Sequence, residues 1–283
     1  MKNCLQGRST TVKKQSKSVV AYIFRNFWQL ALTVLPLAVL GGVFFNFDSS
    51  GKFVHDAFSG LVSKDSFFGD IAKTFICVRF ARYWYANIFT AMALVLVNSL
   101  LIVKISRHMR VGAMSAFPIK EALKLAPAIF LYAVTFFVAV QLLELITMGI
   151  VAMLSFVDRI SVLVSIYMTL SFISELLLSY VFARLLCTFP LVYCEDYRFF
   201  RAMSFSMRLT DTCKVKALGY AFTYSVAKVA VTAVVTLVGN KTLGYVLYST
   251  FYFVLLIFVL VWAFKMYYDA TGSERHDIGD RLF

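Results

Sequence analysis

The chain has 283 residues, of which 60% are hydrophobic and 15% are charged, and its mean hydropathy is +0.78. A chain of this composition cannot bury its apolar residues in a single water-soluble core, so an ordinary soluble domain is excluded. The formal net charge of +13 at pH 7 leaves two classes of acidic partner, nucleic acid and anionic lipid.

Six stretches of the chain are apolar over about 20 residues or more, the length of helix that crosses a bilayer. They lie at 27–47, 83–103, 126–150, 160–189, 217–238 and 243–265. We therefore predict an all-α fold, a polytopic membrane bundle of six transmembrane helices with short amphipathic interfacial helices on the cytoplasmic side. The predicted domains are a basic cytoplasmic N-terminal segment at 1–26, a six-span transmembrane domain at 27–265 and a cytoplasmic C-terminal tail at 266–283.

The basic content of the connecting segments predicts the orientation of the bundle. Four segments lie on the more basic side, namely 1–26, 104–125, 194–217 and the tail 266–283, and together with Lys265 they hold 19 Lys and Arg residues, against seven in the segments on the other side. By contrast, the connectors after the third and fifth stretches contain only Arg159 and Lys241. Because cytoplasmic loops carry the excess of Lys and Arg, both termini are predicted to be cytoplasmic. Arg79 and Arg82, on the opposite side beside the second stretch, are the contrary observation.

Aromatic residues and prolines mark several expected helix ends. Trp and Tyr are enriched at membrane surfaces, and the predicted anchors are Trp28, Trp84, Tyr85, Trp262, Tyr267 and Tyr268. The Phe-rich segment 48–82 predicts a helix lying on the outer membrane boundary. Pro118 suits the first turn of a helix, whereas Pro127 and Pro190 are each expected to break or kink one.

Basic amphipathic stretches at 13–26, 117–126 and 197–216 each run directly into a span. One interpretation is a threefold repeat of an interfacial helix followed by a helical hairpin. The alternative is that inward loops are basic in any membrane protein.

The third of these stretches has the strongest pattern. At 100° per residue it separates an apolar arc from a basic arc, which is typical of a helix lying in the membrane interface. The apolar arc holds Phe199, Phe200, Met203 and Met207, and the basic arc holds Arg198, Arg201 and Arg208. Basic groups beside a span meet the negative cytoplasmic leaflet at about 1 kcal/mol each. The three arginines are therefore the predicted contacts for anionic lipid headgroups, and no nucleic-acid partner is expected. The alternative is a plain surface-anchoring segment.

Four ionisable residues lie inside apolar stretches: Glu144, Glu175, Arg184 and Lys228. A charge at mid-bilayer costs about 2.5 to 3.5 kcal/mol, so such groups are expected to face the bundle interior and to pair. Glu175 and Lys228 both lie near the middle of their stretches and are the predicted ion pair. The pair is either a structural salt bridge or part of a proton or solute pathway. The predicted packing face of the fifth stretch is formed by Gly219, Thr223, Ala227 and Ala230.

Residues for other chemistry do not form recognisable motifs. The three histidines lie in different segments, the five cysteines form no C-x-x-C pair, and no glycine-rich phosphate loop is present. We therefore predict no catalytic site, no metal site and no cofactor.

The segment from Pro190 to Thr210 resembles the YciC-like family of bacterial inner-membrane proteins. More distantly, it resembles the membrane domain of glycerophosphoryl diester phosphodiesterases. The matching positions are Pro190, Glu195 or Asp196, Ala202, Ser206, Leu209 and Thr210, while Tyr197 and Arg198 stand where the family usually has Gly. The resemblance is best over 180–265 and weaker over 111–150. It implies a six-helix protein of the bacterial inner membrane.

Together these features favour a non-enzymatic scaffold or envelope-maintenance component that contacts membrane lipids or other membrane proteins. The alternative is a small-solute or proton-linked transporter or permease that uses the intramembrane charges. An enzyme acting on lipid is the third class.

Overall fold

The computed structural model consists of helices throughout the residues that it describes, which are 19–44, 56, 59, 63–75, 84–112, 118–154, 156, 159–238 and 241–272. The long helices are α1 (Val19–Phe44), α5 (Trp84–Val111), α6 (Ile119–Met153), α7 (Ile160–Leu185), α10 (Lys214–Val238) and α11 (Lys241–Thr271). The shorter ones are α3 (Lys64–Thr74), α8 (Thr188–Cys194), α9 (Phe199–Leu209) and the 3₁₀ helix η2 (Thr210–Cys213). The all-helical prediction is confirmed for this part of the chain, and each predicted apolar stretch coincides with one long helix.

Within the described residues, four helical segments are long and apolar enough to cross a membrane. They are Ala91–Val111, Ile119–Met153, Ile160–Cys194 and Val254–Thr271. A fifth apolar segment, Val19–Val34, is shorter. α1 starts upstream of the predicted first span, and the rest of the predicted N-terminal segment, residues 1–18, lies outside the described part. α11 continues past the predicted sixth span to Thr271.

Side-chain contacts tie several helix ends together on one side of the molecule. Tyr22, near the start of α1, has its hydroxyl oxygen 2.9 Å from Nδ1 of His108 near the end of α5. Arg107 of α5 forms an ion pair with Glu121 in the first turn of α6. The hydroxyl of Tyr193 in α8 donates to the same carboxylate at 3.0 Å. The start of α1, the end of α5, the start of α6 and α8 therefore meet.

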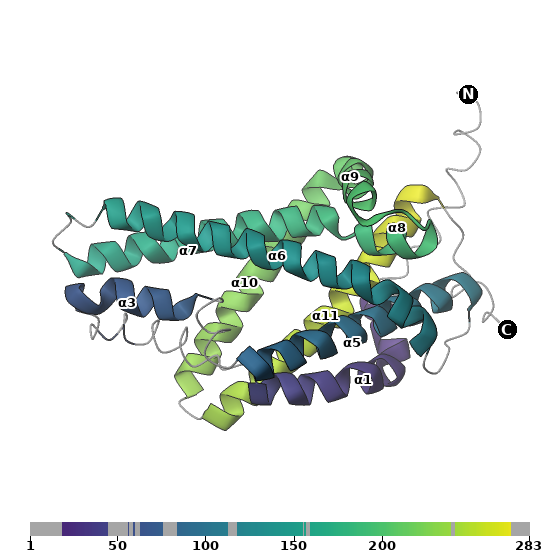
Figure 1. Ribbon diagram of the computed structural model, residues 1–283, viewed down its shortest axis with the longest axis horizontal. Coiled ribbons are helices and arrows are strands. Elements are labelled where there is room, and N and C mark those ends of the chain that lie inside the picture. The colour runs from purple at the N-terminus through teal and green to yellow at the C-terminus, as the bar shows by residue number, and fades with distance from the viewer. Residues whose placement is uncertain are drawn as a thin grey trace.

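The last helix ends at the same place. Tyr267, near the end of α11, donates a hydrogen bond to the carboxylate of Glu195, which directly follows α8. We call this side of the molecule the α8 end. The α6–α7 turn and α3 lie at the opposite side, which we call the turn end (Figure 1). Consecutive long helices thus run alternately away from the α8 end and toward it, although of the long helices described only α6 and α7 reach the turn end (Figure 1).

α3 is the amphipathic helix predicted in the 48–82 segment. Ser63 caps its first turn by accepting a hydrogen bond from the backbone N–H of Ser66 at 3.2 Å. Its apolar side, formed by Phe67, Ile71 and Phe75, is buried against the α6–α7 hairpin, in a small core separate from the main one. A helix that buries its apolar side against other helices is anchored by protein contacts as well as by any membrane surface.

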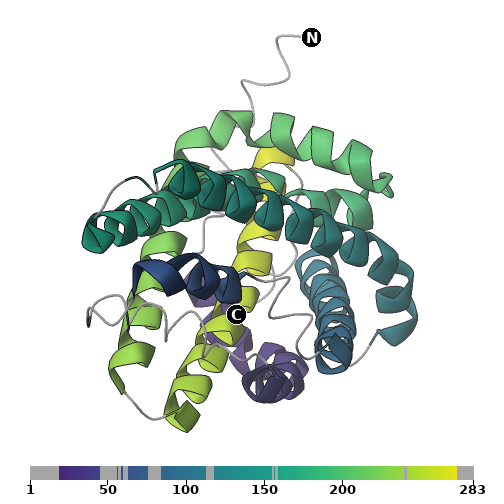
Figure 2. The same ribbon diagram turned by 60° about the vertical axis from the view of Figure 1, so that its left-hand side comes forward.

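The hairpin of α6 and α7 has few fully buried residues, and most of its side chains are exposed or half-buried. In the most apolar part of each segment, only 11% of the residues of α6 and 6% of those of Ile160–Cys194 are buried within the protein. The corresponding shares are 56% for α5 and 50% for α11. Large apolar side chains such as Phe130, Leu145 and Leu177 point outward. Figure 2 shows that α6 and α7 lie along one side of the molecule. In water this surface would be a large exposed apolar patch.

The prolines act differently from their sequence-based interpretation. α6 runs through Pro127 without interruption, so the predicted break there is wrong, and Pro118 precedes the first turn as its N-cap. α7 ends at Leu185, and Pro190 is the third residue of α8. Because proline cannot bond the carbonyl four residues earlier, here that of Leu186, the break falls upstream of the proline.

Continuity of α6 also corrects the repeat interpretation. The stretch 117–126 is mostly the first part of α6 and is no separate interfacial helix. In the stretch 13–26, the described residues belong to α1. Of the three predicted stretches, 197–216 is the one whose described residues form a separate amphipathic helix, α9, before the next long helix. The threefold repeat is therefore not present in the form predicted.

Three further predictions of side-chain environment are wrong. In α10 the fully buried small side chains are Ala217, Ala221 and Ser225, whereas Gly219, Thr223 and Ala230 of the predicted packing face are exposed. Tyr267 and Tyr268 are buried inside the protein, so they are no surface anchors, although Trp28, Trp84 and Tyr85 are exposed. Lys104, expected in a basic loop, lies within α5, is buried, and donates to the Thr33 hydroxyl of α1 at 2.7 Å.

Candidate functional site

The junction of α7 and α9 is built from small side chains at helical spacing. Ala202, Ser206 and Thr210 follow one another at intervals of four residues, so they share one face of α9 and η2. All three are fully buried. Because none is larger than Thr, the α9 backbone can approach the end of α7 closely. The structure therefore gives these three residues a packing role.

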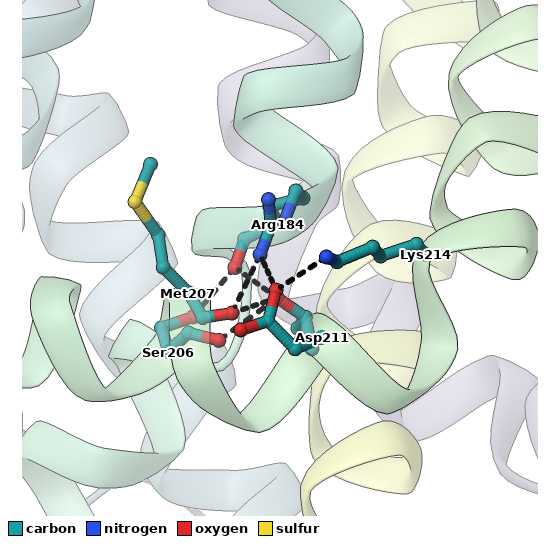
Figure 3. Close-up of polar contacts among 6 residues, drawn as sticks. Arg184, Ser206, Met207, Asp211 and Lys214 are labelled. Carbon is teal, nitrogen blue, oxygen red and sulfur yellow. Dashed lines mark hydrogen bonds and ion pairs between the residues drawn. The ribbon is translucent and has the colours of Figure 1, made fainter.

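Hydrogen bonds cross this junction in both directions (Figure 3). The Ser206 and Thr210 hydroxyls donate to the backbone carbonyl of Arg184, in the last turn of α7, at 2.8 Å and 3.2 Å. In return the Arg184 guanidinium donates to the backbone carbonyl of Met207 at 2.8 Å and to the carboxylate of Asp211. The last carbonyls of a helix need partners from outside the helix. α9 supplies them for α7, so its position is fixed by the end of that span.

Asp211 is the acidic centre of the junction. Its carboxylate forms ion pairs with Arg184 and with Lys214, whose Nζ lies 3.3 Å away in the first turn of α10. Partial desolvation raises the pKa of Asp211, but the contacts with Lys214 and Arg184 outweigh it and hold the pKa below its ordinary value. Arg184 is the more enclosed partner, with 18% of its side chain exposed against 48% for Asp211. The aspartate therefore links the end of α7 to the start of α10.

The outer surface of α9 has an apolar side and a basic side. Phe200 and Met207 are exposed on the first, and Arg201 and Arg208 are exposed on the second. The predicted apolar arc is therefore divided, because Phe199 faces inward with the small residues while Phe200 and Met207 face outward.

One of the predicted lipid-binding arginines already has aromatic neighbours. The Arg201 guanidinium lies 5.3 Å from the Tyr197 ring centroid and 5.9 Å from that of Phe205, in cation–π geometry. The two rings stack on each other at 5.1 Å. Phe205, which lies near the basic arc of α9 rather than on its apolar arc, is therefore part of the contact with Arg201. Arg198 is exposed at the N-cap of α9.

The turn before α9 depends on Asp196. Its φ is +52°, in the left-handed region that favours glycine and that aspartate tolerates better than most residues. The family resemblance places a glycine in this turn, where Tyr197 and Arg198 stand. Here the left-handed residue is Asp196, one position earlier, so the turn forms without that glycine.

A second polar site lies between α7 and α10, as the sequence predicted. The Lys228 Nζ is 2.8 Å from Oε1 of Glu175, with 32% and 24% of the two side chains exposed. One helical turn closer to the α8 end, the Ser225 hydroxyl donates to the Ser179 hydroxyl at 3.3 Å, and both residues are buried. α7 and α10 are therefore joined by one ion pair and one hydrogen bond at adjacent levels.

The other two predicted intramembrane charges have different neighbours. Glu144 accepts a hydrogen bond from the Gln141 side chain of the same helix at 2.8 Å. Arg184 belongs to the junction with α9. The four ionisable residues therefore divide among three places along α6, α7 and α10, with only Glu175 and Lys228 paired to each other.

Sequence reasoning missed the acceptor and donors that position α9. Asp211 and the hydroxyls of Ser206 and Thr210 were not predicted to contact α7. The available signal was the spacing of Ala202, Ser206 and Thr210, which marks a small-residue face. The Glu121 contacts with Arg107 and Tyr193 gave no sequence signal, because they join three separate helices.

The described part of the chain contains no group of three or more His, Cys, Asp or Glu side chains arranged to hold a metal ion. Comparison with models of protein families, with curated proteins and with solved structures finds no match to the chain.

Proposed function

We propose that this protein is a six-span integral protein of a bacterial inner membrane that acts as a non-enzymatic scaffold, with α9 binding anionic lipid headgroups on the cytoplasmic side. The observation that carries the proposal is the position of α9. It is fixed to the end of a span by its buried side, while its apolar and basic sides are both exposed.

The exposed apolar surface of α6 and α7 supports the membrane part of the proposal. Side chains such as Phe130 and Leu177 are more than half exposed, although they lie in the middle of long apolar helices. Lipid chains would cover this surface without any polar group losing a hydrogen bond. α1 and α10 complete the proposed set of six spans.

The arrangement of the helix ends supports the proposed topology. The α8 end collects the start of α1, the end of α5, the start of α6, α8 and the end of α11. These are the places where the four segments of the more basic side begin or end. An excess of basic residues on one side indicates the cytoplasmic side, so we assign the α8 end to the cytoplasm.

The two outer sides of α9 fit the boundary between headgroups and acyl chains. Phe200 and Met207 would enter the acyl region, while Arg201 and Arg208 would reach the phosphates, as in interfacial helices generally. The resemblance to the YciC-like family agrees with this assignment, because the residues that carry it are those that dock α9 on α7.

Lipid retention tests the headgroup contacts. The full-length protein in detergent is titrated with phosphatidylglycerol or phosphatidylcholine, and bound lipid is counted by native mass spectrometry. At about 1 kcal/mol per basic group, Arg208→Gln is expected to weaken phosphatidylglycerol binding about fivefold and to leave phosphatidylcholine unchanged. Arg159→Gln, at the turn end, is the matched control and should change neither. Equal losses in the two variants, or none, would exclude α9 as the lipid-binding element.

The Glu175–Lys228 pair is the observation that favours the second candidate, a transporter. Charges within spans are frequent in ion and substrate pathways. A transporter requires that Glu175→Gln abolishes movement of a solute into proteoliposomes while the yield of folded protein is unchanged. A scaffold requires that the same change acts on stability alone.

A further inference from the structure

The exposure of polar side chains on α7 changes steadily along one face of the helix. At 100° per residue Ser161, Ser165, Ser171, Glu175 and Ser179 fall within about 120° of one another, and we call this the serine face. The same arc also holds the half-buried Val164, Met168 and Phe172, of which Val164 and Met168 pack against the small core around α3. Ser161 and Ser165 are exposed, Ser171 and Glu175 are half-buried, and Ser179 is buried. The serine face therefore closes progressively from the turn end toward the α8 end.

The course of α10 explains this gradient. Figures 1 and 2 show α10 leaving α9 beside α7 and then diverging from it, so that its far end lies away from the α6–α7 turn. The two helices are in contact at Ser179 and Ser225, and at Glu175 and Lys228. Beyond Lys228, Val229 of α10, which is 40° from Ser225 around the helix, is about half exposed.

The ion pair lies where the two helices separate. About a quarter to a third of each side chain, 24% for Glu175 and 32% for Lys228, is uncovered by protein. Oε1 of Glu175 is buried, but the uncovered parts of the two side chains border this space, and hydrocarbon there would leave a charged pair beside lipid, which is unfavourable. Water meets no such penalty, and the exposed hydroxyls of Ser161 and Ser165 would line its route.

The α8 end of the serine face is closed. Ser179 and Ser225 are buried and bonded to each other, and Ala183 and Ala221 beside them are fully buried. The junction of Arg184 with Asp211 and α9 lies beyond them. A route that reaches the ion pair from the turn end therefore stops there.

We infer that water enters the membrane along the serine face of α7 from the turn end and hydrates the Glu175–Lys228 pair, with no opening toward the α8 end. The ligand of this site is water together with small hydrated ions. The inference rests on the proposed membrane span but not on the lipid contacts of α9, and it requires no transport.

Thiol accessibility tests the inference in the full-length protein in sealed proteoliposomes. In five separate variants, cysteine replaces Ser165, Ser171, Ile173, Ser179 or Arg159, and labelling by a membrane-impermeant maleimide is measured above that of the parent protein. Maleimides react with the thiolate, which hydrocarbon suppresses and water supports. Ile173 is the matched control, because it is two residues from Ser171 but on the opposite, outward side of α7. Gel filtration shows that each variant is folded.

The expected result is that Ser165→Cys and Ser171→Cys react at least about tenfold faster than Ile173→Cys, which corresponds to one unit of thiol pKa. They should react from the same side of the vesicle as Arg159→Cys in the α6–α7 turn. Ser179→Cys should stay unlabelled from both sides.

Three results would overturn the inference, and they differ in what else they affect. If Arg159→Cys reacts but neither serine variant does, lipid or a second copy of the chain fills the space, and the proposed span still stands. If Ser179→Cys reacts from the side opposite to Arg159→Cys, the closure is absent. If Ile173→Cys reacts as fast as Ser171→Cys, α7 is surrounded by water and the proposed span fails as well.

Discussion

Removal of the two hydroxyls that bond the Arg184 carbonyl gives the sharpest test of how α9 is held. Ser206 and Thr210 are fully buried, and the Ser206 hydroxyl donates to this oxygen at 2.8 Å. Thr210 Oγ1 lies 3.2 Å from the same oxygen but nearer to the backbone carbonyls of Ser206 and Met207, at 2.9 Å and 3.1 Å, so its one proton is shared among three acceptors. A buried hydrogen bond contributes about 0.5 to 1.5 kcal/mol net. We expect Ser206→Ala to lower the free energy of unfolding by about 1 kcal/mol, and Thr210→Val by less, because its contact is longer.

The double variant tests whether the two hydroxyls can replace each other as donors to the Arg184 carbonyl. In each single variant the remaining hydroxyl still serves the carbonyl, whereas Ser206→Ala with Thr210→Val removes both side-chain donors. Leaving a buried carbonyl short of donors costs about 1 to 3 kcal/mol. The double variant should therefore lose about 1 kcal/mol more than the sum of the singles.

Titration with SDS in mixed micelles, followed by tryptophan fluorescence of the full-length protein, measures these differences. Ser165→Ala is the control, because Ser165 is exposed and donates only to the Ser161 carbonyl of its own helix at 2.9 Å. It should change stability by less than about 0.5 kcal/mol. The reasoning is refuted if Ser206→Ala costs no more than Ser165→Ala, or if the two buried changes are additive.

Three other predictions concern separate parts of the molecule. The pKa of Asp211 is lowered in the folded protein, so the stabilisation by its carboxylate is complete above the ordinary pKa of 3.8 and is lost as pH falls through the lowered value. The difference in melting temperature between the parent protein and Asp211→Asn should therefore shrink on acidification. A difference that does not change with pH contradicts this. In an SDS titration, Glu175→Gln alone should lower the stability of the protein more than Glu175→Gln combined with Lys228→Met. The single change leaves the partly buried Lys228 ammonium without its counter-charge. Equal losses of stability would mean that the ion pair contributes nothing. Phe67→Ala should weaken the packing of α3 on the α6–α7 hairpin by about 3 kcal/mol or more, because the Phe67 ring is fully buried. Proteolysis within α3 should then be faster than in a Phe68→Ala control. Equal cleavage rates would show that the buried ring does not hold the helix.

The lengths of the apolar stretches and the positions of charged residues within them were enough to predict the long helices and one ion pair. The apolar stretches gave the long helices, and the similar depth of Glu175 and Lys228 in neighbouring spans predicted their contact. Both inferences use distances along a helix, which the sequence contains directly. The amphipathic pattern of residues 197–216 likewise predicted α9.

Contacts between helices determine the orientation of α9 and the length of α5, which the sequence alone did not predict. Which side of α9 faces inward depends on the end of α7, and the small residues Ala202 and Ser206 are selected there over the more apolar Phe200. From the sequence Lys104 was placed in a loop, but α5 continues past it, and its Nζ donates a hydrogen bond to the Thr33 hydroxyl oxygen. A helix boundary set by packing against another helix leaves no mark in local composition.

The closing contacts of the α8 end also dictate an order of assembly during biosynthesis. α1 packs along α11, and Glu195 receives its hydrogen bond from Tyr267, close to the end of the last helix. Chains are made from the N-terminus, so the earliest helix to leave the ribosome stays without its main neighbour until nearly the whole polypeptide has been translated. Premature termination ahead of residue 241 would therefore leave α1 packed on α5 but uncovered on the side that α11 occupies, and such fragments should be targets for quality-control proteases.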